Sequence, residues 1–109
     1  MINLHEKRMH VKETAENGVV NEETIFEFYQ KEDRVLATYR GGKVSRGVLV
    51  GILSEDRFSF NYGQQHLDGN IAGGHSICDI EIQSDGKYRL IEHFQWERGT
   101  GRNVFVELG

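Results

Sequence analysis

Tight turns divide this chain of 109 residues into short segments at intervals of roughly 8–12 residues. The chain has 13 glycines and no proline, so its turns must be built from glycine, asparagine and aspartate, which tolerate the positive φ angles of tight hairpins. Between the turns, apolar and polar residues alternate, as in strands that bury one face. The pattern therefore predicts an all-β protein of about eight antiparallel strands, connected as an up-and-down meander.

One segment of this pattern is ambiguous. In residues 22–30, Ile25, Phe28 and Tyr29 lie at helical spacing after Asn21, which could cap a helix. The segment is short and rich in aromatic and β-branched residues, which favours a strand. We predict strands at 3–16, 22–30, 34–40, 44–53, 57–65, 71–83, 87–97 and 103–108, with a hairpin turn at Asn17-Gly18. A meander of this size removes its exposed edges by closing, or nearly closing, into a barrel.

Length and composition set outer limits on function. A chain of 109 residues fits a single domain spanning positions 1–109. The net charge of −4 argues against nucleic-acid binding, which needs a basic surface. The polar N-terminus and the lack of a long apolar run predict no signal peptide and no membrane association. The one cysteine, Cys78, excludes an internal disulfide, so we expect a cytoplasmic protein.

The stretch Lys87–Glu97 offers the best candidate site. Alternation places Tyr88, Leu90, Glu92, Phe94 and Trp96 on one face, so an apolar, aromatic face carries one carboxylate. A barrel of about eight strands either fills its interior with side chains or leaves room for one small ligand. In the binding interpretation, Glu92 is the polar anchor; in the structural one, it pairs with Arg46 or Tyr39, or lies at an edge open to water. The predicted ligand-lining residues are Tyr39, Tyr62, Glu92, Phe94 and Trp96.

Other chemistry has weaker support. The five histidines follow no metal-ligand spacing, and His75 and His93 fall on predicted outward faces. Cys78 shares a face with Ile80 and Ile82, which indicates a buried, inert thiol rather than a nucleophile. We therefore predict no catalytic residues, no metal and no cofactor.

Three stretches together resemble a group of small bacterial proteins: Thr38–Gly51, Phe58–Gly74 and Leu90–Glu107. The shared features include Gly47-x-Leu49-x-Gly51 and Gln95-Trp96 before a glycine-rich turn. Members look like calycin-type (lipocalin-like) barrels and often carry the label N-acetylglutamate synthase. That activity implies a coenzyme A loop with Gln or Arg at its start and a helix after it. Here Trp96 stands at that position and a predicted strand follows, so the residues favour a binding protein over an acetyltransferase.

Three functions are compatible with these sequence features. The first is a non-catalytic protein that binds a small, partly apolar ligand inside the barrel. The alternative is an enzyme, either the acetyltransferase of the family label or another. The third is a structural protein with a filled core, which self-associates, for instance as a homodimer, through outward residues such as Val48 and Val50.

Overall fold

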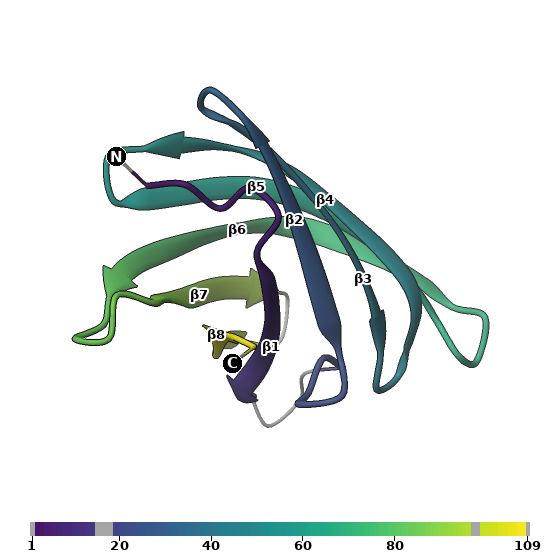
Figure 1. The fold of residues 1–109 in the computed structure, drawn as a ribbon. Helices are drawn as coiled ribbons and strands as arrows, with labels where there is room; N and C mark the ends of the chain where they lie inside the picture. Colours follow the sequence, from purple (N-terminus) through teal and green to yellow (C-terminus); the bar gives the residue numbers. More distant parts are fainter. Residues whose placement is uncertain (1, 15–18, 97–98, 109) are drawn as a thin grey trace.

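A closed barrel of eight antiparallel strands makes up the protein (Figure 1). The computed structural model describes residues 2–14, 19–96 and 99–108, without the side chains of 94–100. Each strand pairs with its neighbours in the sequence, and β1 pairs with β8 to close the ring. The strands are β1 (Arg8–Glu13), β2 (Ile25–Lys31), β3 (Arg34–Gly41), β4 (Val44–Ser54), β5 (Arg57–His66), β6 (Ile71–Ile82), β7 (Tyr88–Trp96) and β8 (Gly99–Glu107). The predicted all-β, up-and-down barrel is confirmed.

The ambiguous segment is a strand, and the helical alternative is wrong. β2 begins at Ile25 rather than at residue 22, because a turn before it is held by side-chain bonds. The backbone N–H of Asn21 donates to Thr24 Oγ1 at 3.0 Å, and the Thr24 hydroxyl donates to the Gly41 carbonyl oxygen at 3.0 Å. Gly41 has a φ of 115°, and a Cβ there would lie 2.0 Å from the Glu23 carbonyl oxygen. The turn that we predicted at Asn17-Gly18 lies outside the described residues.

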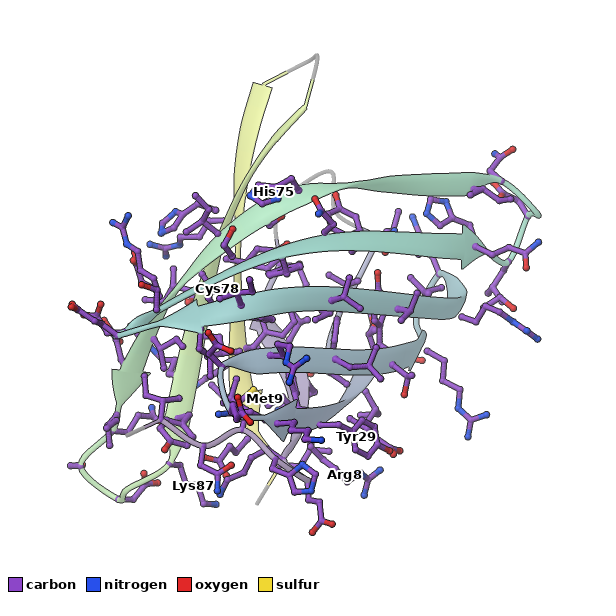
Figure 2. All side chains as sticks on the ribbon, turned by 90° about the horizontal axis from the view of Figure 1, so that it is seen from above. Arg8, Met9, Tyr29, His75, Cys78 and Lys87 are labelled. Carbon is purple, nitrogen blue, oxygen red and sulfur yellow. The ribbon has the colours of Figure 1, made fainter. Side chains whose placement is uncertain are left out.

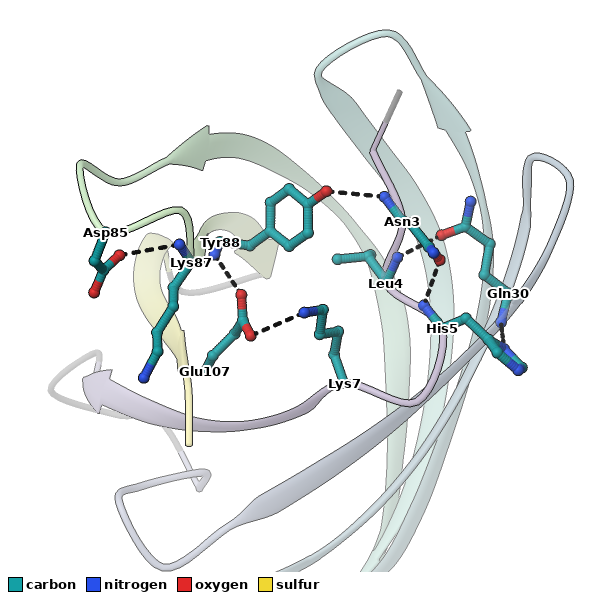
Figure 3. Close-up of polar contacts among 9 residues, drawn as sticks. All are labelled: Asn3, Leu4, His5, Lys7, Gln30, Asp85, Lys87, Tyr88 and Glu107. Carbon is teal, nitrogen blue, oxygen red and sulfur yellow. Dashed lines mark hydrogen bonds and ion pairs between the residues drawn. The ribbon is translucent and has the colours of Figure 1, made fainter. Parts of the chain in front are cut away.

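The N-terminal strap, residues 2–7, lies across one end of the barrel. In Figure 1 it is on the same side as the β4–β5 and β6–β7 turns. Its backbone N–H groups donate from Asn3 to the Tyr88 hydroxyl at 3.0 Å and from Leu4 to Gln30 Oε1 at 2.8 Å (Figure 3). Leu4 is fully buried. We predicted a strand from residue 3, but Glu6 has a φ of 62°, which breaks the extended conformation, so β1 begins only at Arg8.

Aromatic rings of the interior lie over glycines of neighbouring strands. Tyr39 of β3 is opposite Gly47 of β4, and Tyr62 of β5 is opposite Gly74 of β6. A Cβ on Gly47 would lie 2.3 Å from Tyr39 Cζ, and one on Gly74 would lie 3.1 Å from the Tyr62 hydroxyl oxygen. The glycines therefore make room for rings inside a narrow barrel, as well as easing the bending of the wall.

Alternation along each strand separates the core from the surface. On β6, Cys78 is buried and His75 is exposed, because three residues along a strand lead to the opposite face (Figure 2). Phe26 stacks on Tyr39 with ring centroids 4.4 Å apart and meets Phe105 edge-on at 4.7 Å. The other large, fully buried side chains of the core include Phe28, Phe58, Leu4, Met9 and Leu90. No helix among the described residues is long and apolar enough to span a membrane.

Candidate functional site in the barrel wall

Three buried polar side chains lie together on neighbouring strands of the wall. Glu92 of β7 is opposite Asn103 on one neighbouring strand, β8, and opposite Cys78 on the other, β6. Ser76 lies two residues before Cys78 on β6, on the same face of the strand. Glu92 is 7%, Asn103 4% and Ser76 1% exposed. The Asn103 amide donates from Nδ2 to Glu92 Oε1 at 2.9 Å. We call these three residues the carboxylate cluster.

Burial dominates the electrostatics of Glu92. Removal from water raises the pKa of this carboxyl, while the Asn103 bond, the nearby Ser76 hydroxyl and the charge of His93 oppose that rise. Ser76 Oγ makes no well-formed hydrogen bond to a described atom, so its interaction with the Glu92 carboxylate is a weak one. A buried, unsatisfied hydroxyl costs free energy, so Ser76 offers a ready hydrogen-bonding group to anything that enters.

Two tyrosines of the interior lie within electrostatic reach of Glu92. Burial first, and the charge of Glu92 second, raise the pKa of both Tyr39 and Tyr62 above the ordinary value. The Tyr39 hydroxyl donates to Gln64 Oε1 at 2.7 Å, and Gln64 Nε2 lies 3.0 Å from His66 Nε2. Because Gln64 uses its oxygen for Tyr39, its amide donates to His66, whose Nε2 accepts. These two hydrogen bonds hold the Tyr39 hydroxyl in place and connect it, through Gln64, to the partly exposed His66.

The structure brings together three of the five residues that we predicted to line the ligand: Tyr39, Tyr62 and Glu92. The backbones of Phe94 and Trp96 belong to β7, with Phe94 opposite Ser76 on β6. Their side chains lie outside the described part of the chain, so their place in the lining stays a prediction.

Glu92 makes a hydrogen bond, as the structural alternative predicted, but its partner is neither Arg46 nor Tyr39. Arg46 is exposed, and the carboxylate instead accepts from Asn103, which sequence reasoning missed. In the last strand, both Val104 and Phe105 are buried, so its apolar residues do not reveal which face turns inward. Asn103 has the same parity as the aromatic Phe105, and that shared face was the available signal.

The remaining reactive groups have ordinary surroundings. Cys78 is 1% exposed, and burial raises the pKa of its thiol well above the usual range, as expected for an inert cysteine. His75 bonds Ser59 and Asn61 on the outer face, and His93 bonds Asp79 there. Within the described ranges, no group of three or more His, Cys, Asp or Glu side chains could hold a metal ion.

A surface hollow of about 650 Å³ is a weaker candidate. It lies near the β3–β4 turn and is lined in part by Arg8, Glu27 and Arg40, whose charges are of both signs and which occupy exposed outward positions. Such a mixture is typical of a solvated surface. We therefore place the candidate site at the carboxylate cluster.

An edgeless, eight-stranded meander with polar groups among its buried wall residues is a calycin-type barrel. The family model described as "Avidin-like protein" matches residues 2–108, so the chain belongs to the avidin-like family. Searches of the curated proteins and of the solved structures found no match. The resemblance to proteins labelled N-acetylglutamate synthase was wrong, because the family match covers nearly the whole chain and that enzyme has a different fold.

Proposed function

We propose that this protein binds a small, partly apolar molecule inside its barrel and does not transform it. The observation that carries the proposal is the carboxylate cluster, because buried polar groups in an apolar surround are the usual means of orienting a small ligand. Membership of the avidin-like family supports it, since barrels of this family bind small ligands such as biotin. The proposed lining combines Glu92, Tyr39 and Tyr62 with Phe94 and Trp96.

The proposal is tested by native mass spectrometry of the purified protein, followed by titration with biotin and a small-molecule library. Trp96 is the only tryptophan, so quenching or a shift of its emission reports on β7 directly. Ser76→Ala is expected to weaken binding of any hit, whereas Ser59→Ala, on the outer face of neighbouring β5, is the matched control and is expected to leave it unchanged. Absence of any hit, or equal effects of the two variants, would contradict binding inside the barrel.

We also propose a homodimer formed through the outer face of β3 and β4. Val48, Val50 and Ile52 are 45%, 54% and 54% exposed, and Leu36 of β3 lies opposite Val50. These apolar side chains would be buried by a second barrel packed face to face. Sedimentation equilibrium over a wide concentration range tests this, with Val50→Lys expected to yield monomers. A wild-type monomer at all concentrations would exclude the dimer. We propose the cytoplasm as the location, consistent with Cys78 being a free thiol.

A further inference from the structure

Among the described residues, Glu92 is a buried acid with no buried base to balance it. Across the described residues, the buried polar or charged side chains are Thr24, Gln64, Ser76, Glu92 and Asn103, without a lysine, arginine or histidine among them. A buried carboxylate is costly unless an opposite charge or several hydrogen bonds compensate for the lost hydration. In the described structure, Asn103 supplies one such bond.

The basic side chains described around this part of the barrel have other partners, and Arg102, next to Asn103, lies 4.0 Å from Glu13. His93 is next to Glu92 in the sequence, but its side chain is 53% exposed and lies 3.1 Å from Asp79 on the outer face. Lys7 lies at the end covered by the N-terminal strap, 3.3 Å from Glu107 (Figure 3). Neither side chain has Glu92 as its ion-pair partner.

Neutral hydroxyl and thiol groups lie within electrostatic reach of Glu92. Burial first, and the negative charge of Glu92 second, raise the pKa of Tyr39, Tyr62 and the Cys78 thiol. Ser76 adds a hydroxyl oxygen that makes no well-formed hydrogen bond to a described atom. The described part of the cluster therefore presents oxygen atoms that can accept hydrogen bonds and one carboxylate, and it holds no positive charge.

We propose that the ligand of this barrel carries a primary ammonium group, which pairs with Glu92 and donates a hydrogen bond to Ser76 Oγ. This inference rests on the proposed function, because it assigns the head group of the molecule bound there. An ammonium group has three donors and a full positive charge, and charge-assisted hydrogen bonds are the stronger kind. Its apolar remainder would lie against the aromatic rings of the interior.

The test compares probes that differ only in the head group: 1-hexylamine, 1-hexanol and hexanoic acid. Binding to the wild-type protein is measured by saturation-transfer NMR and by titration calorimetry at pH 7.5 or so. We expect the amine to bind at least about tenfold more tightly than the alcohol, a difference of about 1.4 kcal/mol, and the acid to bind more weakly than both.

Glu92→Gln separates a charge from a hydrogen-bonding role, because glutamine imitates a protonated glutamate in size and donor capacity. The variant is expected to bind amine and alcohol alike, whereas Glu81→Gln, which neutralises an exposed outer carboxylate, is expected to keep the tenfold preference. As the pH is lowered, the affinity for the amine should fall in the wild-type protein, because Glu92 becomes protonated, and should stay constant in Glu92→Gln. Circular dichroism verifies that each variant is folded.

The other outcomes overturn the inference. Equal binding of amine and alcohol to the wild-type protein would show that the ammonium–Glu92 pair does not form, and the proposed function would then stand with a neutral ligand. A preference for the amine that persists in Glu92→Gln would also overturn the pair, because a group other than Glu92 would then recognise the ammonium. Failure of all three probes to bind would overturn the ammonium inference and would count against the proposed function as well.

Discussion

Replacement of Gly47 by alanine tests whether the fit between rings and glycines shapes the barrel. The new Cβ would lie 2.3 Å from Tyr39 Cζ and 2.4 Å from its Cε2, far inside van der Waals contact. The ring has little freedom to move, because it stacks on Phe26 at 4.4 Å and its hydroxyl bonds Gln64 at 2.7 Å. Overpacking of this kind costs about 1–3 kcal/mol. Alanine regains about 0.5–1 kcal/mol of backbone entropy relative to glycine in a strand, so we expect a net loss of about 1–2 kcal/mol.

The matched control is Gly63→Ala on β5, where an added Cβ meets nothing within 4 Å. That variant should be as stable as the wild-type protein or slightly more so. Urea denaturation monitored by circular dichroism gives both changes in the free energy of unfolding, and thermal melts should show a fall of about 4 °C or more per kcal/mol. Adding Tyr39→Leu to Gly47→Ala should cost less than adding it to the wild-type protein. Equal stability of Gly47→Ala and Gly63→Ala would refute the argument that the ring occupies this space.

Three further predictions concern Glu92, the strap and the buried thiol. Because burial raises the folded-state pKa of Glu92 above the unfolded value of about 4.3, its contribution to stability is present at low pH and is lost as pH rises through the raised pKa. Glu92→Gln should therefore gain stability relative to the wild-type protein between pH 4 and 7 in urea titrations, and a constant difference would contradict the raised pKa. Leu4→Ala should cost about 2–3 kcal/mol, the lower part of the range for buried leucines, since Leu4 is fully buried; the exposed Leu36→Ala should cost far less in the same melts. Iodoacetamide should label Cys78 slowly in native protein and rapidly in urea, as followed by mass spectrometry, and rapid native labelling would show that the thiol is accessible.

The sequence predicts the architecture well because a meander records its strands locally. Alternation from Phe58 to Tyr62, and turns at Gly41-Gly42, are short-range signals that depend on no distant residue. The strand ends were less accurate, since Glu6 adopts a positive φ at a position with no glycine to announce it. We predicted that the sheet closes into a barrel because about eight strands can close and because closure removes the exposed edge strands.

The site was only partly predictable for a physical reason. The position of Glu92 on an aromatic face could be read from β7 alone, but its partner comes from β8 and the unsatisfied hydroxyl from β6. Pairing across strands depends on register, and a shift of one residue would have turned Asn103 outward. Sequence alternation gives the face of each strand more readily than its register.

The hydrogen-bonded ladder between β1 and β2 is the shortest contact between neighbouring strands of the barrel. It has three paired positions, from Arg8 opposite Glu27 to His10 opposite Ile25, whereas β4 and β5 are paired from Val44 to Ser54. β1 pairs with β8 from Met9 opposite Glu107 to Glu13 opposite Val104. Two backbone hydrogen bonds, from Glu6 N–H to the Phe28 carbonyl and from Phe28 N–H to the Lys7 carbonyl, extend the contact with β2 into the N-terminal strap. The β1–β2 ladder is therefore the shortest of the ring. If the wall opens sideways, it should part there, giving the interior a lateral route that leaves the β4–β5 side intact.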